Sequence, residues 1–232
     1  MNPFPPNATV VLVHGAWADG SSWQNVILPL RREGLEVMCA QLPLTSLTDD
    51  IAALQRVIER TNGPIALAGH AYGGAVIAAG NDDRVKSLVY VAALAPDEGE
   101  TVADVFYRAA PHPDAPHLAP DEHGFIWMPE EGFSRAVAHK ASPDQANILS
   151  AVQRPIALKC IQEKAPAPAW RTKPSWFLLA EEDRMISPET QRYMADRMGA
   201  NIRSHHVDHS PMLTAPGVVV EVILDAARQT LR

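Results

Sequence analysis

The sequence has few cysteines, no long apolar run and no dense cluster of basic residues, and each shortage excludes a class of protein. Its two cysteines, Cys39 and Cys160, lie far apart, so we expect core thiols and not a disulfide or a zinc pair. Without an apolar segment of membrane-spanning length or a basic leader in residues 1–7, we expect a cytoplasmic protein with no membrane contact. A formal net charge of −7 argues against nucleic-acid partners.

Apolar runs and amphipathic segments alternate along most of the 232 residues. The apolar runs are rich in β-branched residues and are typical of strands buried on both faces of a parallel sheet. An alternation of six such strands with helices predicts an α/β fold, with a mainly parallel sheet covered by helices on both faces. The predicted strands are 8–13, 35–41, 64–69, 85–93, 175–180 and 202–207. The first two helices are predicted to start with Ser21 or Ser22 as the cap and with Thr48.

Residues 96–174 interrupt this alternation, because they are rich in proline and contain no clear strand. Large apolar side chains such as Phe106, Tyr107 and Trp127 argue against a disordered linker. We therefore predict a core formed by residues 1–95 and 175–232, with residues 96–174 inserted as a small helical lid. Its predicted helical pieces are 101–109, 134–139 and 143–152.

The segment Gly69-His70-Ala71-Tyr72-Gly73-Gly74 lies between a predicted strand and a helix of small residues. A sharp strand-to-helix turn of the pattern G-x-S-x-G lifts a nucleophilic serine clear of a sheet, and its glycines allow the backbone to bend. In this chain Ala71 stands at the centre of the pattern, and alanine has no nucleophilic atom. Ala71 therefore marks the position at which a nucleophile is expected and absent.

Other chemically competent groups lie where predicted strands end. Asp183 follows strand 175–180 and His209 follows strand 202–207, which gives the chain order of nucleophile position, acid and histidine. In such a site His209 would transfer protons, while Asp183 would orient its imidazole ring. The backbone N–H groups of Ala16 and Tyr72 would form an oxyanion hole. Each feature is weak evidence alone, but together they predict a hydrolase site.

With these motifs the chain resembles the α/β-hydrolases, and most of all the short lidded branch with plant methyl-salicylate esterases, plant hydroxynitrile lyases and small bacterial esterases. The resemblance covers nearly the whole chain and is carried by residues 11–17, 69–74, 182–186 and 208–213. It implies that Asp183 and His209 are the acid and the base, and that Ala16 and Tyr72 supply the oxyanion donors.

Two departures from the family pattern favour a hydrolase over a hydroxynitrile lyase. Hydroxynitrile lyases of this type carry lysine after the catalytic histidine and threonine at the place of Gly15, whereas this chain has Ser210 and Gly15. The resemblance then implies hydrolysis of a small carboxylic ester or lactone through an acyl-enzyme. Because family members carry serine at position 71, we interpret the chain as an inactivated Ser→Ala variant. The alternative is a catalytically silent homologue that binds a small ligand.

The side chains expected in the pocket are mostly apolar or aromatic, so they favour a substrate with a largely apolar acyl or alcohol group. The partner expected is a small-molecule ester, and a homodimer is left open. The residues expected to contact the ester are Gly15, Trp17, His70, Phe106, Tyr107, Trp127 and Met128.

Two other chemistries have less support. The run His205-His206-Val207-Asp208-His209 nearly matches the metal-ligand pattern H-x-H-x-D-H, but Ser204 stands at its first histidine. No His or Cys follows His209 to complete such a site. The glycine-rich turn at Ala71 lacks the G-x-G-x-x-G spacing of a dinucleotide site. We therefore expect neither a metal nor another cofactor.

Overall fold

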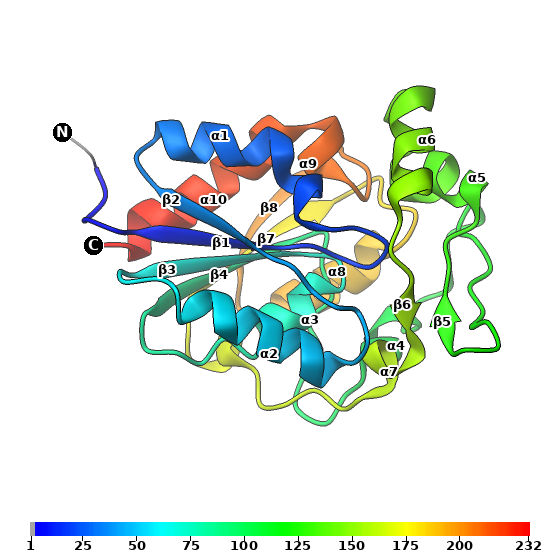
Figure 1. Ribbon diagram of the computed structural model, residues 1–232, viewed down its shortest axis with the longest axis horizontal. Helices are drawn as coiled ribbons and strands as arrows, with labels where there is room; N and C mark the ends of the chain where they lie inside the picture. Colours follow the sequence, from blue (N-terminus) through cyan, green and yellow to red (C-terminus); the bar gives the residue numbers. More distant parts are fainter. Residues whose placement is uncertain (1–2) are drawn as a thin grey trace.

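The computed structural model describes residues 3–232. Its central sheet has six strands in the order β2-β1-β3-β4-β7-β8 (Figure 1), and every neighbouring pair is parallel. This sheet confirms the predicted α/β class. The strands are β1 (Thr9–Val13), β2 (Glu36–Ala40), β3 (Ile65–His70), β4 (Val85–Val91), β7 (Ser175–Ala180) and β8 (Asn201–His205).

Helices cover both faces of the sheet, so the molecule has one hydrophobic core on each side of it. Alternate strand residues point to opposite faces. Val11 and Val13 of β1 belong to one core, while Val10 and Leu12 belong to the other. In Figure 1, α1, α9 and α10 lie above the sheet, and α2 and α3 lie below it. The bounds are η1 (Gly20–Trp23), α1 (Gln24–Arg32), α2 (Leu47–Ile58), α3 (Gly73–Ile77), α8 (Pro188–Arg197), α9 (Pro211–Thr214) and α10 (Pro216–Thr230).

Two helix starts differ from the prediction by a few residues. The first helical segment was expected to begin at Ser21 or Ser22, but Asp19 caps the short turn η1, and α1 follows from Gln24. Helix α2 was expected to open at Thr48, but Ser46 caps it, and the Ser46 hydroxyl accepts a hydrogen bond from the Asp49 amide at 3.0 Å. Several adjacent residues can serve as caps in both places, so sequence alone does not select one.

Residues 96–174, called the insertion below, separate β4 from β7 and contribute no strand to the central sheet. They contain one short antiparallel pair, β5 with β6, where no strand was expected. Strands of two residues are too short to produce a periodic pattern. Figure 1 shows α5, α6, β5 and β6 gathered at one end of the sheet. The elements are α4 (Val102–Phe106), β5 (Phe125–Ile126), α5 (Glu130–Gly132), η2 (Phe133–Val137), α6 (Pro143–Val152), β6 (Ile156–Ala157), α7 (Leu158–Gln162) and η3 (Ala169–Arg171).

Among residues 3–232 there is no helix with both the length and the apolar character that a bilayer crossing requires.

Candidate active site

The turn after β3 holds Ala71 in a strained backbone conformation. Its φ is +48°, a left-handed value that costs a non-glycine residue about 1–2 kcal/mol. The flanking glycines are required by close backbone approach. A Cβ atom at Gly69 would lie 2.6 Å from the Gly73 carbonyl oxygen, and one at Gly73 would lie 2.6 Å from that of Val13. The turn therefore has the backbone geometry of a strand-to-helix elbow, with the Ala71 methyl group at its apex.

His209 and Asp183 form a buried pair at the ends of β8 and β7. Nδ1 of His209 lies 2.8 Å from Oδ2 of Asp183. The Asp183 carboxylate also accepts hydrogen bonds from the Met185 and Ile186 amides at 2.7 and 2.9 Å, and from Nε2 of Gln191 at 2.8 Å. A carboxylate only accepts, so Nδ1 of His209 carries a hydrogen, and in a neutral ring Nε2 would then be the acceptor. The pair has the orientation that a general base requires.

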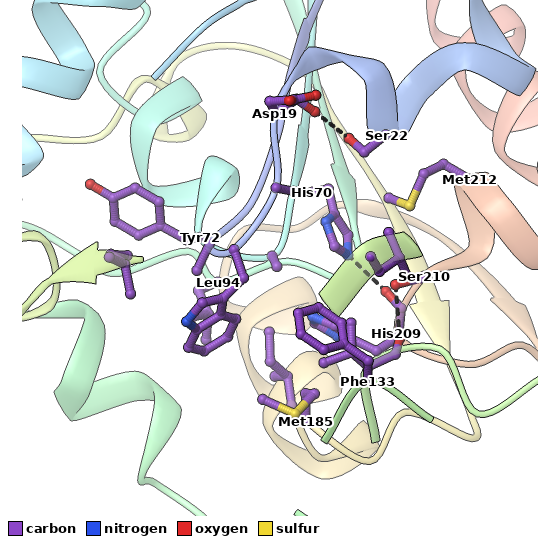
Figure 2. A pocket seen from close by; sticks show the side chains of 18 of the residues that line it. Asp19, Ser22, His70, Tyr72, Leu94, Phe133, Met185, His209, Ser210 and Met212 are labelled. Carbon is purple, nitrogen blue, oxygen red and sulfur yellow. Dashed lines mark hydrogen bonds between the residues drawn. The ribbon is translucent and has the colours of Figure 1, made fainter. Parts of the chain in front are cut away.

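His70 holds the loop of His209 through a hydrogen bond to its backbone. Its Nε2 lies 2.7 Å from the carbonyl oxygen of His209, and because a carbonyl only accepts, Nε2 carries the hydrogen (Figure 2). Burial lowers the pKa of His70 well below its usual value, and the neighbouring His209 and His14 act in the same direction. His70 is therefore a neutral ring that fixes the His209 loop. Within residues 3–232, its buried Nδ1 has no hydrogen-bond partner.

His14 orients the loop that follows β1. Its Nε2 accepts a hydrogen bond from the Leu42 amide at 3.0 Å, so its Nδ1 carries the hydrogen and donates to the Gly15 carbonyl at 2.8 Å. Burial lowers the pKa of His14 to about 4. Beyond Gly15, the backbone N–H groups of Ala16 and Tyr72 donate to no other group within residues 3–232. Both amides are thus available to an oxyanion.

Asp50 anchors Tyr72, and nothing in the sequence marks this carboxylate as part of the site. The Tyr72 hydroxyl donates to Oδ2 of Asp50 at 2.7 Å, and the Leu44 amide donates to Oδ1 at 2.8 Å. The thiol of Cys160 lies 3.6 Å from Oδ2. The carboxyl is fully buried, and this burial raises its pKa despite the three donors. As an acidic residue early in α2, Asp50 resembled an ordinary helix-dipole charge, so no signal separated it from Asp49.

A mostly apolar cavity of about 350 Å³ lies where the carboxyl ends of the strands meet the insertion. Its wall includes Ala16, Ala71, Tyr72 and His209, so the predicted oxyanion donors, nucleophile position and base border one space. Figure 2 shows the rings of His70 and Phe133 close to His209, whereas the ring of Tyr72 points away from them. Among the predicted substrate contacts, Trp17, His70, Phe106 and Tyr107 lie in the wall. Asp183 stands behind His209 and does not line the cavity.

Three predicted substrate contacts lie elsewhere. Trp127 is 51% exposed, and its indole N–H donates to Asp121 at 3.2 Å. Met128 is buried in the hydrophobic core beside the cavity and does not line it. Gly15 lies behind Ala71, where an added Cβ would be 3.0 Å from the Ala71 Cβ. The wall instead uses insertion residues that had no distinguishing pattern, such as Leu118, Ile126, Phe133, Ile148, Leu149 and Val152.

Hydrogen bonds connect the insertion to the loops of the site. They reach the loop after β1, the loop before His209 and the residue after it, so the insertion is joined to the catalytic edge at separate points. The pairs are Trp17 Nε1 with the Ile126 carbonyl at 2.9 Å, the Lys140 amide with Asp208 Oδ2 at 3.0 Å, and Ser210 Oγ with the Val137 carbonyl at 2.8 Å.

The histidines of the near metal motif do not converge. Nδ1 of His206 pairs with Glu181 at 2.6 Å on an exposed surface, whereas His209 points into the cavity wall. Over residues 3–232, no group of three or more His, Cys, Asp or Glu side chains is arranged to hold a metal ion.

A parallel sheet with a strained elbow, a buried His–Asp pair and two free amides at its carboxyl edge defines the α/β-hydrolase class. The chain belongs to the alpha/beta hydrolase family, whose model matches residues 10–222. It is 24% identical to Methylesterase 2 of Arabidopsis thaliana, over 94% of this chain and 95% of that protein.

Solved structures agree on the fold. Polyneuridine aldehyde esterase superposes with a TM-score of 0.82 at 17% identity, covering 95% of this chain and 99% of that one. An H243A variant of tomato methylketone synthase I, complexed with β-ketoheptanoate, superposes with a TM-score of 0.80 at 18% identity, covering 96% and 98%. These structures confirm the predicted fold, and the family model confirms the predicted α/β-hydrolase family.

Proposed function

We propose that this site hydrolyses small, largely apolar carboxylic esters or lactones when a serine stands at position 71, and that the chain with Ala71 is an inactivated form of that hydrolase. The observation that carries the proposal is the strained elbow at Ala71 beside the intact His209–Asp183 pair. The helical insertion would act as a lid over the ester. The apolar wall of the cavity and the free amides of Ala16 and Tyr72 suit a small ester whose carbonyl carbon faces position 71.

The mechanism follows from the geometry of these groups. Nε2 of His209 takes the proton of the serine hydroxyl as the oxygen attacks the ester carbonyl, and Asp183 stabilises the imidazolium that forms. The amides of Ala16 and Tyr72 bind the developing oxyanion. His209 then gives its proton to the leaving alcohol, and water releases the acyl group by the same route. With Ala71 only direct attack by water remains, so we expect a very large loss of turnover.

The test is the Ala71→Ser variant assayed with p-nitrophenyl acetate and butanoate. We expect kcat/KM to rise by about 10³-fold or more over the Ala71 chain, because nucleophile and base act as a unit. The matched control is the Ala71→Ser/His209→Ala double variant, which should lose this gain. Mass spectrometry of the Ala71→Ser protein should detect an acyl group on the elbow peptide. If Ala71→Ser is inert on esters and lactones, the proposal is refuted and the silent, ligand-binding homologue replaces it.

A second candidate uses Ala71 as it stands. His209 and the amides of Ala16 and Tyr72 are present although position 71 has no nucleophile. No Lys or Arg of residues 3–232 lines the cavity. A solved relative carries β-ketoheptanoate. A β-keto acid would give its proton to His209 Nε2, lose CO₂ by cleavage of the bond to the carboxyl carbon, and leave an enolate oxygen on the Ala16 and Tyr72 amides. His209 would then return the proton to carbon and yield a methyl ketone.

This second activity is tested on the Ala71 chain with β-ketooctanoate, by measuring ketone release by gas chromatography. The candidate requires a rate above the uncatalysed one that His209→Ala removes. An equal rate with and without protein would exclude it, whatever the Ala71→Ser variant does with esters.

A further inference from the structure

One face of α6 borders the cavity and is at the same time open to solvent. Ile148 and Val152 lie one helical turn apart on this face, and both line the cavity. They are nevertheless 61% and 54% exposed. Tyr107, at the end of α4, also lines the cavity and is 55% exposed. We call these three side chains the apolar rim. Exposed apolar groups that border one cavity indicate that a ligand or partner covers them.

The rim continues the interior of the cavity. Inside it, Leu149 of the same helix, Phe133 and Ile156 present further apolar surface. The reacting centre, at Ala71 and His209, borders the same space. An occupant held by its carbonyl group at the Ala16 and Tyr72 amides can therefore extend over apolar wall until it reaches Ile148 and Val152.

We infer that the site takes an ester with an unbranched aliphatic chain, which runs from the oxyanion hole through the cavity and leaves it over Ile148 and Val152. The inference rests on the proposed function for the placement of the ester carbonyl. A flexible chain suits this path because the wall supplies apolar contact along its length. The rim would then be covered whenever substrate is bound.

Burial of a chain predicts a dependence on its length. Each methylene group that the wall removes from water should tighten binding about fourfold, which corresponds to about 0.8 kcal/mol. Methylenes at the rim remain partly in water, so their gain should be smaller, about twofold each. The dissociation constant should therefore fall steeply with the first added carbons, then more slowly, and reach a plateau once the chain passes Val152.

The experiment measures binding to the Ala71 chain, which should leave esters intact. Methyl esters from butanoate to decanoate are titrated, and the change in tryptophan fluorescence, to which Trp17 in the wall contributes, reports occupancy. A parallel series of alkyl acetates distinguishes a chain on the acyl side from one on the alcohol side. The rim variant Ile148→Ser/Val152→Ser should weaken binding of the decanoate about tenfold and binding of the butanoate much less. Leu28→Ser, which removes an equally exposed apolar side chain outside the cavity wall, should change neither.

Two results would overturn the inference. One is a dissociation constant independent of chain length in both series. The other is a rim variant that binds all esters normally but changes from dimer to monomer in light scattering, which would assign the rim to a second copy of the chain. Failure of the proposed function is recognised separately, because an inert Ala71→Ser variant with intact length-dependent binding would leave a carrier of aliphatic esters.

Discussion

Replacement of Tyr72 by phenylalanine tests whether Asp50 holds the oxyanion hole in place. The substitution removes one hydroxyl and with it the 2.7 Å hydrogen bond to Asp50, while the backbone amide of Tyr72 stays. Removing the donor of a buried hydrogen bond costs about 1–3 kcal/mol, and more where the acceptor is charged. Asp50 is fully buried, so no water can replace the lost donor, and only the Leu44 amide and the weakly donating Cys160 thiol remain. We expect the free energy of unfolding to fall by about 1.5–3 kcal/mol at pH 7.

The loss should depend on pH. Burial raises the pKa of Asp50 above its ordinary value of 3.8, so the folded protein keeps this proton to a higher pH than the unfolded chain does. The contribution of Asp50 to stability is therefore best below pH 3.8 and falls as the pH rises through the raised pKa. The Tyr72 hydroxyl opposes this shift, so its removal raises the pKa further and costs more at pH 7 than at pH 4.

Urea unfolding at pH 4 and pH 7 measures both effects. Tyr107→Phe is the matched control, because Tyr107 is 55% exposed and its loss of a hydroxyl should cost little. In the Ala71→Ser background, Tyr72→Phe should lower kcat with little change in KM, because a displaced amide weakens contact with the transition state. An equal loss of stability at both pH values, or a loss no greater than that of Tyr107→Phe, would refute the role given to Asp50.

Two further predictions concern the loop after β1. The pKa of His14 falls from 6.5 to about 4 on folding, so the free energy of unfolding should decrease by up to about 3 kcal/mol as the pH falls from 6.5 toward 4. Urea unfolding across this range should show a shallower decrease for His14→Gln. An identical dependence on pH in both proteins would contradict the neutral, buried state given to His14. In the Ala71→Ser background, Gly15→Ala places a Cβ 3.0 Å from the side chain at position 71 and should reduce kcat/KM at least tenfold, whereas Gly217→Ala, which meets nothing within 4 Å, should leave it unchanged.

The parts of the site that the sequence predicts are those fixed by backbone geometry. Asp183 and His209 follow strands that are recognisable from their apolar runs, and parallel strands bring their carboxyl ends to one edge. Gly69 and Gly73 identify the elbow because the backbone there approaches other backbone too closely for a Cβ. These constraints act over a few residues, so they leave a local pattern.

The contacts that the sequence does not predict depend on how the insertion meets the core. Trp127 and Met128 follow the two-residue strand β5, and small shifts of its pairing decide whether each side chain faces solvent, core or cavity. Asp50 is buried by partners from three separate segments, through Leu44, Tyr72 and Cys160. No pattern around residue 50 encodes those partners, because they meet only when the chain has folded.

The strained backbone at Ala71 also has a consequence for the evolution of such a site by point mutation. Every alanine codon differs from a serine codon in its first base alone, so a single nucleotide substitution exchanges the methyl group for a hydroxymethyl group. The elbow already holds the left-handed conformation, and the base and the amide donors stand around it. Under the proposed function, loss or recovery of the nucleophile would therefore take a single mutational step on an unchanged scaffold.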